Sequence, residues 1–96
     1  MNVEYSKRAV SDLRQIAAYH ARSDDVGVGE KIAAGIRELV SRIAQAPQRG
    51  RPVAQRPGVR VMLLVRYRYK IFYRGAGTTV RIIHIRHMSR RPWSPV

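Results

Sequence analysis

The stretch "YKIFYRGAGTTVRIIHIRH", residues 69–87, decides the fold of this 96-residue chain. Aromatic and β-branched residues dominate both of its halves, and "RGAG", residues 74–77, separates them. Because glycine allows the tight turn that a β-hairpin needs, the pattern predicts two antiparallel strands, about residues 69–74 and 79–86.

Two further strands are predicted on either side of the chain's central part. "VRVMLLV", residues 59–65, precedes the hairpin, and the short alternating stretch "NVEY", residues 2–5, opens the sequence. Residues 46–58, "APQRGRPVAQRPG", contain three prolines and two glycines, so we expect a loop there. The connection near "VRYR", residues 65–68, has no glycine to specify its turn.

Apolar residues recur every three or four positions between the first strand and the loop, which is the spacing of helices with one buried face. Ser6 is placed to cap the first helix, which we expect to run to about Arg22. The second is expected from about Val28 to Ala46, with the apolar stripe Ile32, Ile36, Leu39, Val40 and Ile43.

The predicted order is therefore strand, helix, helix and three strands, without an internal repeat or a linker. Two consecutive helices form a hairpin, and one face of a sheet must bury their apolar stripes. We predict a single α+β domain over residues 1–96. It consists of an N-terminal strand and an antiparallel helical hairpin packed on a mainly antiparallel sheet with three C-terminal strands.

Charge is the most uneven property of the sequence. All six acidic residues lie within residues 1–38, together with six of the nineteen Lys and Arg. The formal net charge of +13 therefore belongs to residues 39–96, which have no acidic side chain. Such a field favours a polyanionic partner, either nucleic acid or an acidic protein segment.

Composition excludes several classes of protein. The chain has no cysteine, so we expect neither disulfides nor thiolate metal sites, and a reducing cytoplasm suits it. The apolar runs are too short to span a bilayer, and "MNVEYSKRAV" has no apolar segment typical of a secretory signal. With no acidic residue after position 38, we expect no metal site, and no cofactor is indicated.

The candidate binding residues are mainly arginines, which hold phosphates and carboxylates with two parallel hydrogen bonds but do not act as general bases. One set lies in the loop and the following strand, and the other on or after the last strand. If the last strand pairs near the middle one, both sets could flank one concave face. They are Arg49, Arg51, Arg56 and Arg60, and then Arg81, Arg86, Arg90 and Arg91.

Aromatic and histidine side chains add fewer candidates. Tyr67, Tyr69 and Tyr73 would share a strand face, where packing in the sheet is favoured over stacking on bases. Trp93 is expected to dock the tail on the domain or to stack on a base. His84 and His87 are three positions apart, which places them on opposite faces of a strand. His87, at the strand end, is the candidate for proton transfer.

Several stretches together resemble the RelE/ParE superfamily of bacterial toxins, in the order and spacing of that family from about Val3 to Trp93. They are "YSKRAVSDLRQIAAYHA" at 5–21, "PQRGRP" at 47–52, "PGVR" at 57–60, "YKIFYR" at 69–74, "IIHIRH" at 82–87 and "RRPW" at 90–93. The resemblance implies the toxin of a type II toxin–antitoxin module of the kind that stabilises plasmids. Its partner would be a cognate antitoxin with an acidic or amphipathic C-terminal segment, in a hetero-oligomer.

Members of this superfamily act in two ways. RelE-like members cut mRNA in the ribosome, and the resemblance would give Arg51, Arg60 and Arg90 the role of stabilising charge and His87 that of acid or base. The chain lacks the loop lysines of that pattern, and Trp93 stands near the position of a C-terminal tyrosine although it cannot transfer a proton. ParE-like members poison DNA gyrase without a recognised nuclease centre.

"RPVAQRPGVR", "YKIFYR" and "HMSRRP" are more similar to the ParE pattern. We therefore favour a ParE-like toxin without a catalytic centre over a RelE-like endoribonuclease. A plain nucleic-acid-binding module is the third alternative. It would explain the charge but not the ordered series of motifs.

Overall fold

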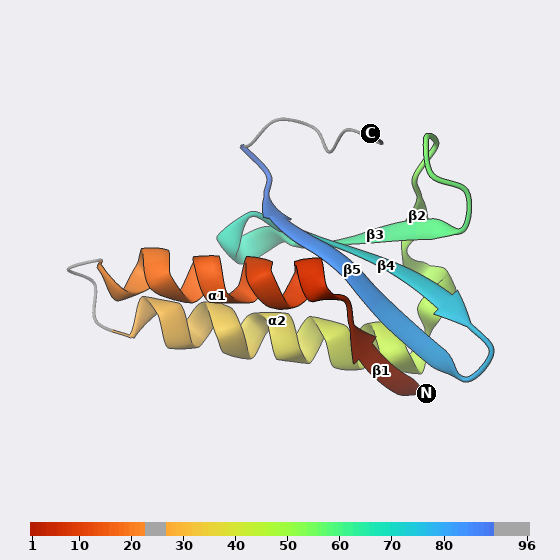
Figure 1. Ribbon diagram of the computed structural model, residues 1–96, viewed down its shortest axis with the longest axis horizontal. Coiled ribbons are helices and arrows are strands. Elements are labelled where there is room, and N and C mark those ends of the chain that lie inside the picture. Colours follow the sequence, from red (N-terminus) through yellow and green to blue (C-terminus); the bar gives the residue numbers. More distant parts are fainter. Residues whose placement is uncertain (23–26, 90–96) are drawn as a thin grey trace.

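The computed structural model describes residues 1–22 and 27–89 of the chain, and Figure 1 shows two layers, a helical hairpin and a sheet. Arg90, Arg91 and Trp93 therefore lie outside the described residues. The helices are α1, Lys7–Ala21, and α2, Val28–Gln45. The strands are β1, Asn2–Tyr5; β2, Arg51–Pro52; β3, Val59–Leu64; β4, Tyr69–Ala76; and β5, Thr79–His87.

The five strands form one sheet in the order β1-β5-β4-β3-β2. β1 runs parallel to β5, and every other neighbouring pair is antiparallel. Both helices cover the same face of the sheet, and the opposite side, at the top of Figure 1, is called the open face below. The predicted α+β class and the helical hairpin on a mainly antiparallel sheet are confirmed.

The core lies between the helices and the sheet. The whole predicted apolar stripe of α2 is buried, which confirms the helical period read from the sequence. β4 and β5 pack against this stripe. Their core side chains are Tyr69, Ile71, Tyr73, Val80, Ile82 and Ile85. A register shift between Phe72 and Tyr73 in their pairing with β5 lets both ends of the hairpin keep their apolar residues inward.

Helix α1 continues the edge of β5 where β1 stops. The Ser6 side chain caps the helix, as predicted, by accepting a hydrogen bond from the Ala9 amide at 3.0 Å. The Ser6 hydroxyl also donates to the Ile83 carbonyl at 2.9 Å, and the Asp12 carboxylate accepts from the Ile85 amide at 2.9 Å. These bonds satisfy backbone groups of β5 that β1 is too short to reach, and so protect a strand edge.

Two elements differ from the expectation. The predicted loop at 46–58 contains a 3-10 turn, Pro47–Arg49, and the two-residue strand β2, which pairs with β3. The turn before β4 is a second 3-10 turn, Val65–Tyr67, followed by Arg68 at φ 62°. The sequence pattern predicts neither element. β2 includes a proline, which a strand tolerates only at a sheet edge. Arg68 adopts a left-handed conformation that is typical of glycine.

No helix in the described ranges combines the length and the apolar character that crossing a membrane requires.

Candidate functional site

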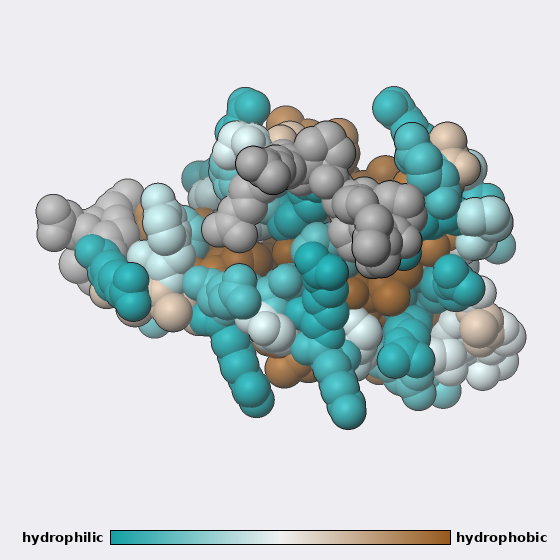
Figure 2. Space-filling model, turned by 45° about the horizontal axis from the view of Figure 1, so that its top comes forward, coloured by the Kyte–Doolittle hydropathy of each residue, from teal (hydrophilic) through white to brown (hydrophobic). Residues whose placement is uncertain are grey.

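The open face carries a groove between the β2–β3 loop and the sheet. Cross-strand pairs in β3, β4 and β5 place Val61, Phe72 and His84 in one row, and Leu63, Lys70 and Arg86 in the next. Alternate residues of a strand point to opposite faces, so these rows lie on the side away from the core residues. Figure 2, which brings the upper side of Figure 1 forward, shows hydrophilic side chains around patches of apolar surface.

Four cationic side chains line this groove, whose volume is about 290 Å³: Arg51, Arg56, Lys70 and Arg86. Val61 and Phe72 of the sheet are apolar parts of its lining, as are residues 52–54 of the β2–β3 segment, and none of the described residues that line it is acidic. Arg51 belongs to β2, Arg56 to the β2–β3 loop and Arg86 to β5. The two predicted sets of arginines thus meet in part, at Arg51, Arg56 and Arg86.

A buried tyrosine anchors the loop that carries Arg51. The Tyr73 hydroxyl donates to the Pro47 carbonyl at 2.6 Å and accepts from the Gly50 amide at 2.9 Å. Burial raises the pKa of Tyr73 above its ordinary value of 10.0, partly offset by the Gly50 amide and Arg60, so it keeps its proton for the bond to Pro47. A Cβ at Gly50 would lie 2.2 Å from the Tyr73 hydroxyl oxygen, so only glycine fits there.

Arg60 belongs to the same anchor. Its guanidinium donates to the Gly50 carbonyl at 2.8 Å and to the Gln48 carbonyl at 3.2 Å. Arg60 therefore holds the loop in place and, in this conformation, does not line the groove beside Arg51.

The other predicted arginines are not part of the groove lining. Arg49 is exposed on the 3-10 turn, and Arg81 is exposed on β5, where it pairs across the sheet with Arg74. Arg90, Arg91 and Trp93 lie outside the described residues.

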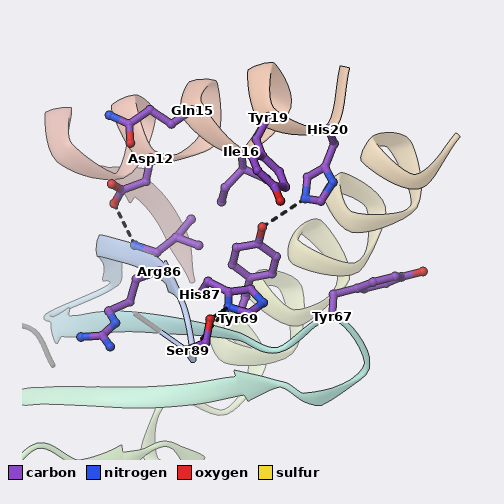
Figure 3. Close-up of a pocket in the computed structure, with 11 residues that line it drawn as sticks. Asp12, Gln15, Ile16, Tyr19, His20, Tyr67, Tyr69, Arg86, His87 and Ser89 are labelled. Carbon is purple, nitrogen blue, oxygen red and sulfur yellow. Dashed lines mark hydrogen bonds between the residues drawn. The ribbon is translucent and has the colours of Figure 1, made fainter. Parts of the chain in front are cut away.

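His87 lies on the other side of β5, in a cavity of about 390 Å³ under α1. Its ring makes an edge contact with Tyr69, with 5.2 Å between centroids, and its Nδ1 is 2.6 Å from the Ser89 hydroxyl. His20 of α1 reaches the opposite end of Tyr69, with Nε2 3.2 Å from its hydroxyl oxygen (Figure 3). The predicted proton-transfer residue thus faces the helix side, away from Arg51.

His84 occupies the opposite face from His87, as its spacing predicts. It stacks on Phe72, with 5.7 Å between ring centroids, and its Nδ1 lies 2.6 Å from the Asp12 carboxylate. Burial lowers the pKa of His84 below its ordinary value of 6.5, against the pull of Asp12, and Arg8 and Arg86 lower it further. His84 is thus a buried structural partner of Asp12 beside the groove.

The described residues contain no group of three or more His, Cys, Asp or Glu side chains placed to hold a metal ion. In chemical terms the groove can bind carboxylates or phosphates, since guanidinium and ammonium groups surround an aromatic ring. It contains no general base among the residues that line it.

Three residues at these sites were missed in the sequence. Lys70 precedes the core residue Ile71, and this alternation was the available signal that its side chain lies on the open face. His20 lies four residues after Ile16, on the same face of the helix, and this spacing was the available signal. Asp12 gave no signal, since its pairing with β5 depends on how the helix lies on the strand.

Comparison with known proteins accords with this arrangement. Residues 3–92 match the family model described as the ParE toxin of type II toxin-antitoxin system, parDE. No curated protein matches the chain significantly.

Among solved structures, the chain is similar to one from the chromosomal ParDE system of P. aeruginosa. That match has 25% identity and a TM-score of 0.81, and covers 93% of this chain and 97% of the other. A chain of the intact E. coli RelBE toxin–antitoxin complex matches with 14% identity and a TM-score of 0.63, covering 93% and 98%. The isolated E. coli RelE toxin matches with 15% identity and a TM-score of 0.63, covering 94% and 86%. At these identities, the two E. coli matches show a shared fold.

Proposed function

The chain belongs to the ParE toxin family of type II toxin–antitoxin systems, and we propose that it arrests growth by poisoning DNA gyrase until a cognate antitoxin neutralises it. The antitoxin would bind through an acidic or amphipathic C-terminal segment. The open-face groove is the contact surface that we assign to these protein partners.

The chemistry of the groove supports a protein partner of negative charge. Arg51, Arg56, Lys70 and Arg86 can pair with carboxylates, and Phe72 offers an apolar contact at the same place. An amphipathic segment satisfies both kinds of contact at once. The similarity to a chain from a ParDE system in P. aeruginosa also supports an antitoxin partner.

One observation carries the choice of a gyrase poison over a nuclease. Cleavage of RNA needs a base, a proton donor and cationic groups around the same phosphate. Arg51 lines the groove, Arg60 is hydrogen-bonded to loop carbonyls, and His87 lies in the cavity on the other side of β5. Because these three lie in different surroundings, we infer that they do not act together on one phosphate; Arg90, the fourth residue of the RelE-like expectation, lies outside the described residues.

The mechanism is tested with two purified systems. We expect the chain to inhibit supercoiling by DNA gyrase and to leave mRNA on programmed ribosomes intact. Cleavage of ribosome-bound mRNA with unaffected gyrase would establish the RelE-like alternative. Growth of bacteria expressing verified amounts of the chain, without arrest, would contradict the toxin assignment itself.

The role of the groove is tested by charge reversal. In Arg51→Glu/Arg56→Glu, we expect the affinity for the cognate antitoxin to fall by about a hundredfold, because two pairing cations become anions. The matched control is Arg14→Glu/Lys31→Glu, which changes the net charge equally at exposed positions of α1 and α2. Equal losses in both variants, measured by calorimetry, would show that overall charge and not the groove determines binding.

A further inference from the structure

The cavity under α1 has walls unlike those of the groove. Five of its lining residues carry an aromatic ring: Tyr19, His20, Tyr67, Tyr69 and His87. The rings stand edge to face, with 5.0 Å between the centroids of Tyr19 and His20 and 5.2 Å between those of Tyr69 and His87. Figure 3 shows Tyr19, His20, Tyr69 and His87 close together, coming from α1, β4 and the end of β5, with Tyr67 of the 3-10 turn to one side. Such a site can contact a flat ring on several sides.

Hydrogen-bond donors and acceptors lie beside these rings in the cavity. The lining includes the Gln15 amide, the Ser89 hydroxyl and the imidazoles of His20 and His87, which together offer hydrogen-bond donors and acceptors. Asp12 is the one acid among the described lining residues, and its carboxylate already binds the Ile85 amide and His84. Arg86 also lines the cavity, so a guanidinium accompanies the one carboxylate of the described lining.

Two exposed cations flank Tyr67 in the sequence. The Arg66 guanidinium carbon lies 5.4 Å from the centroid of the Tyr67 ring, which lines the cavity. Arg68 directly follows Tyr67 and is exposed. These two side chains are the candidates to contact a phosphate on a ligand that leaves the cavity beside Tyr67.

We propose that this cavity binds a single nucleobase, carried by a free nucleotide or by a nucleic acid strand, with its phosphate toward Arg66 and Arg68. Gln15, His20 and Ser89 each make a hydrogen bond within the chain, to Ser11, Tyr69 and His87, and each has further donor or acceptor capacity. A phenyl or alkyl group of a protein partner would cover that remaining capacity without using it, which is unfavourable. A heterocycle with donors and acceptors at its edge uses this capacity, and every base has a face that stacks on aromatic side chains. This site does not depend on gyrase being the target.

The three histidines of the chain provide the readout. His20 and His87 line the cavity, whereas His84 is buried beside the groove. We would titrate the ring-labelled full chain with the four ribonucleoside 5′-monophosphates and follow the imidazole resonances by NMR. The His20 and His87 resonances should shift and the His84 resonance should stay.

Ribose 5-phosphate and inorganic phosphate are the matched controls, because they carry the charge without the base. If they shift the same resonances with equal affinity, Arg66 and Arg68 bind phosphate alone and the proposal is overturned. A shift of His84 without shifts of His20 and His87 overturns it too, in favour of the groove.

Short single-stranded DNA and RNA distinguish the two sources of the base. If both the single-stranded nucleic acids and the free nucleotides bind, a single nucleotide is sufficient for binding to the cavity. If only the single-stranded DNA or RNA binds, and the His20 and His87 resonances shift, the cavity is still the site and its ligand is a nucleic acid. Failure of both kinds of probe overturns the proposal.

Two variants localise the binding. Tyr67→Ala removes a wall, and we expect affinity to fall about tenfold or more, as for the loss of a stacking ring. Because Tyr67 also packs against the core, the exposed wall residue provides the second variant, Tyr19→Ala, which leaves the fold intact. Tyr5→Ala, on β1 outside the cavity, should keep full affinity. Equal affinity of Tyr5→Ala, Tyr19→Ala and a folded Tyr67→Ala would contradict the site.

Discussion

The groove on the open face and the cavity under α1 lie back to back across β5, yet they differ in chemistry. Arginine and lysine surround the groove, whereas tyrosine and histidine line the cavity. Two histidines three positions apart on β5 lie on the two sides, since His84 stacks beside the groove and His87 faces the helix. Side-chain alternation along β5 thus places His84 and His87, which the sequence presents as one cluster, at two different sites, while Arg86 between them lines both.

Asp12 stands at the boundary between the two regions, and its replacement should have the largest effect on stability. Asp12→Ala removes the acceptor for the Ile85 amide and for His84 Nδ1, two groups with little access to water. We expect the free energy of unfolding to fall by about 3 kcal/mol. Urea denaturation measures it, and Asp12→Asn, which keeps an oxygen acceptor, should lose clearly less. An unchanged midpoint in Asp12→Ala would show that α1 does not hold the edge of β5.

A change at Gly50 should damage the groove side alone. The added Cβ of Gly50→Ala would lie 2.2 Å from the Tyr73 hydroxyl oxygen, so the loop that carries Arg51 must move. We expect a loss of about 2 kcal/mol in the free energy of unfolding, together with weaker antitoxin binding.

Gly75→Ala is the matched control, because nothing lies within 4 Å of a Cβ added there. The NMR resonances of His20 and His87 should be unaffected in Gly50→Ala. If the His20 and His87 resonances shift as strongly as those of the loop residues, the groove and the cavity are not independent of each other.

The smallest effect is a pH dependence from His84. Because burial lowers its folded-state pKa below 6.5, the unfolded chain takes up a proton first as the pH falls. The stability is therefore complete above about pH 6.5 and declines as the pH falls from there through the folded-state pKa. Urea midpoints measured at several pH values should show this decline, and His84→Asn should reduce it. A stability that rises on acidification through this range would contradict the assignment.

The sequence predicted those parts of the fold that rest on local periodicity. The α2 stripe from Ile32 to Ile43, the Ser6 cap and the β4–β5 hairpin each follow from spacing or from one residue's chemistry. The turn of the hairpin was predicted at residues 74–77 but lies at Gly77 and Thr78, because β4 continues to pair with β5 as far as Ala76. The two-residue strand β2 and the turn ending at Arg68 could not be predicted, because the first is fixed by pairing with β3 and the second by a non-glycine residue at positive φ.

The site was predictable to a lesser degree. Alternation correctly separated His84 from His87, and the convergence of Arg51, Arg56 and Arg86 was a hypothesis that needed the sheet register to decide. The hydrogen bonds of Arg60 to the loop, and the meeting of His20 with Tyr69, depend on contacts between elements 10 or more residues apart. Residue type and spacing do not encode such contacts.

The central claim is that toxicity resides in the groove and not in a histidine-based active site. Its most direct test is inhibition of purified DNA gyrase by the wild-type chain, by Arg51→Glu/Arg56→Glu and by His87→Ala. We predict that the charge-reversed variant loses inhibition while His87→Ala retains it. Loss of inhibition in His87→Ala, with full inhibition by the groove variant, would contradict the account.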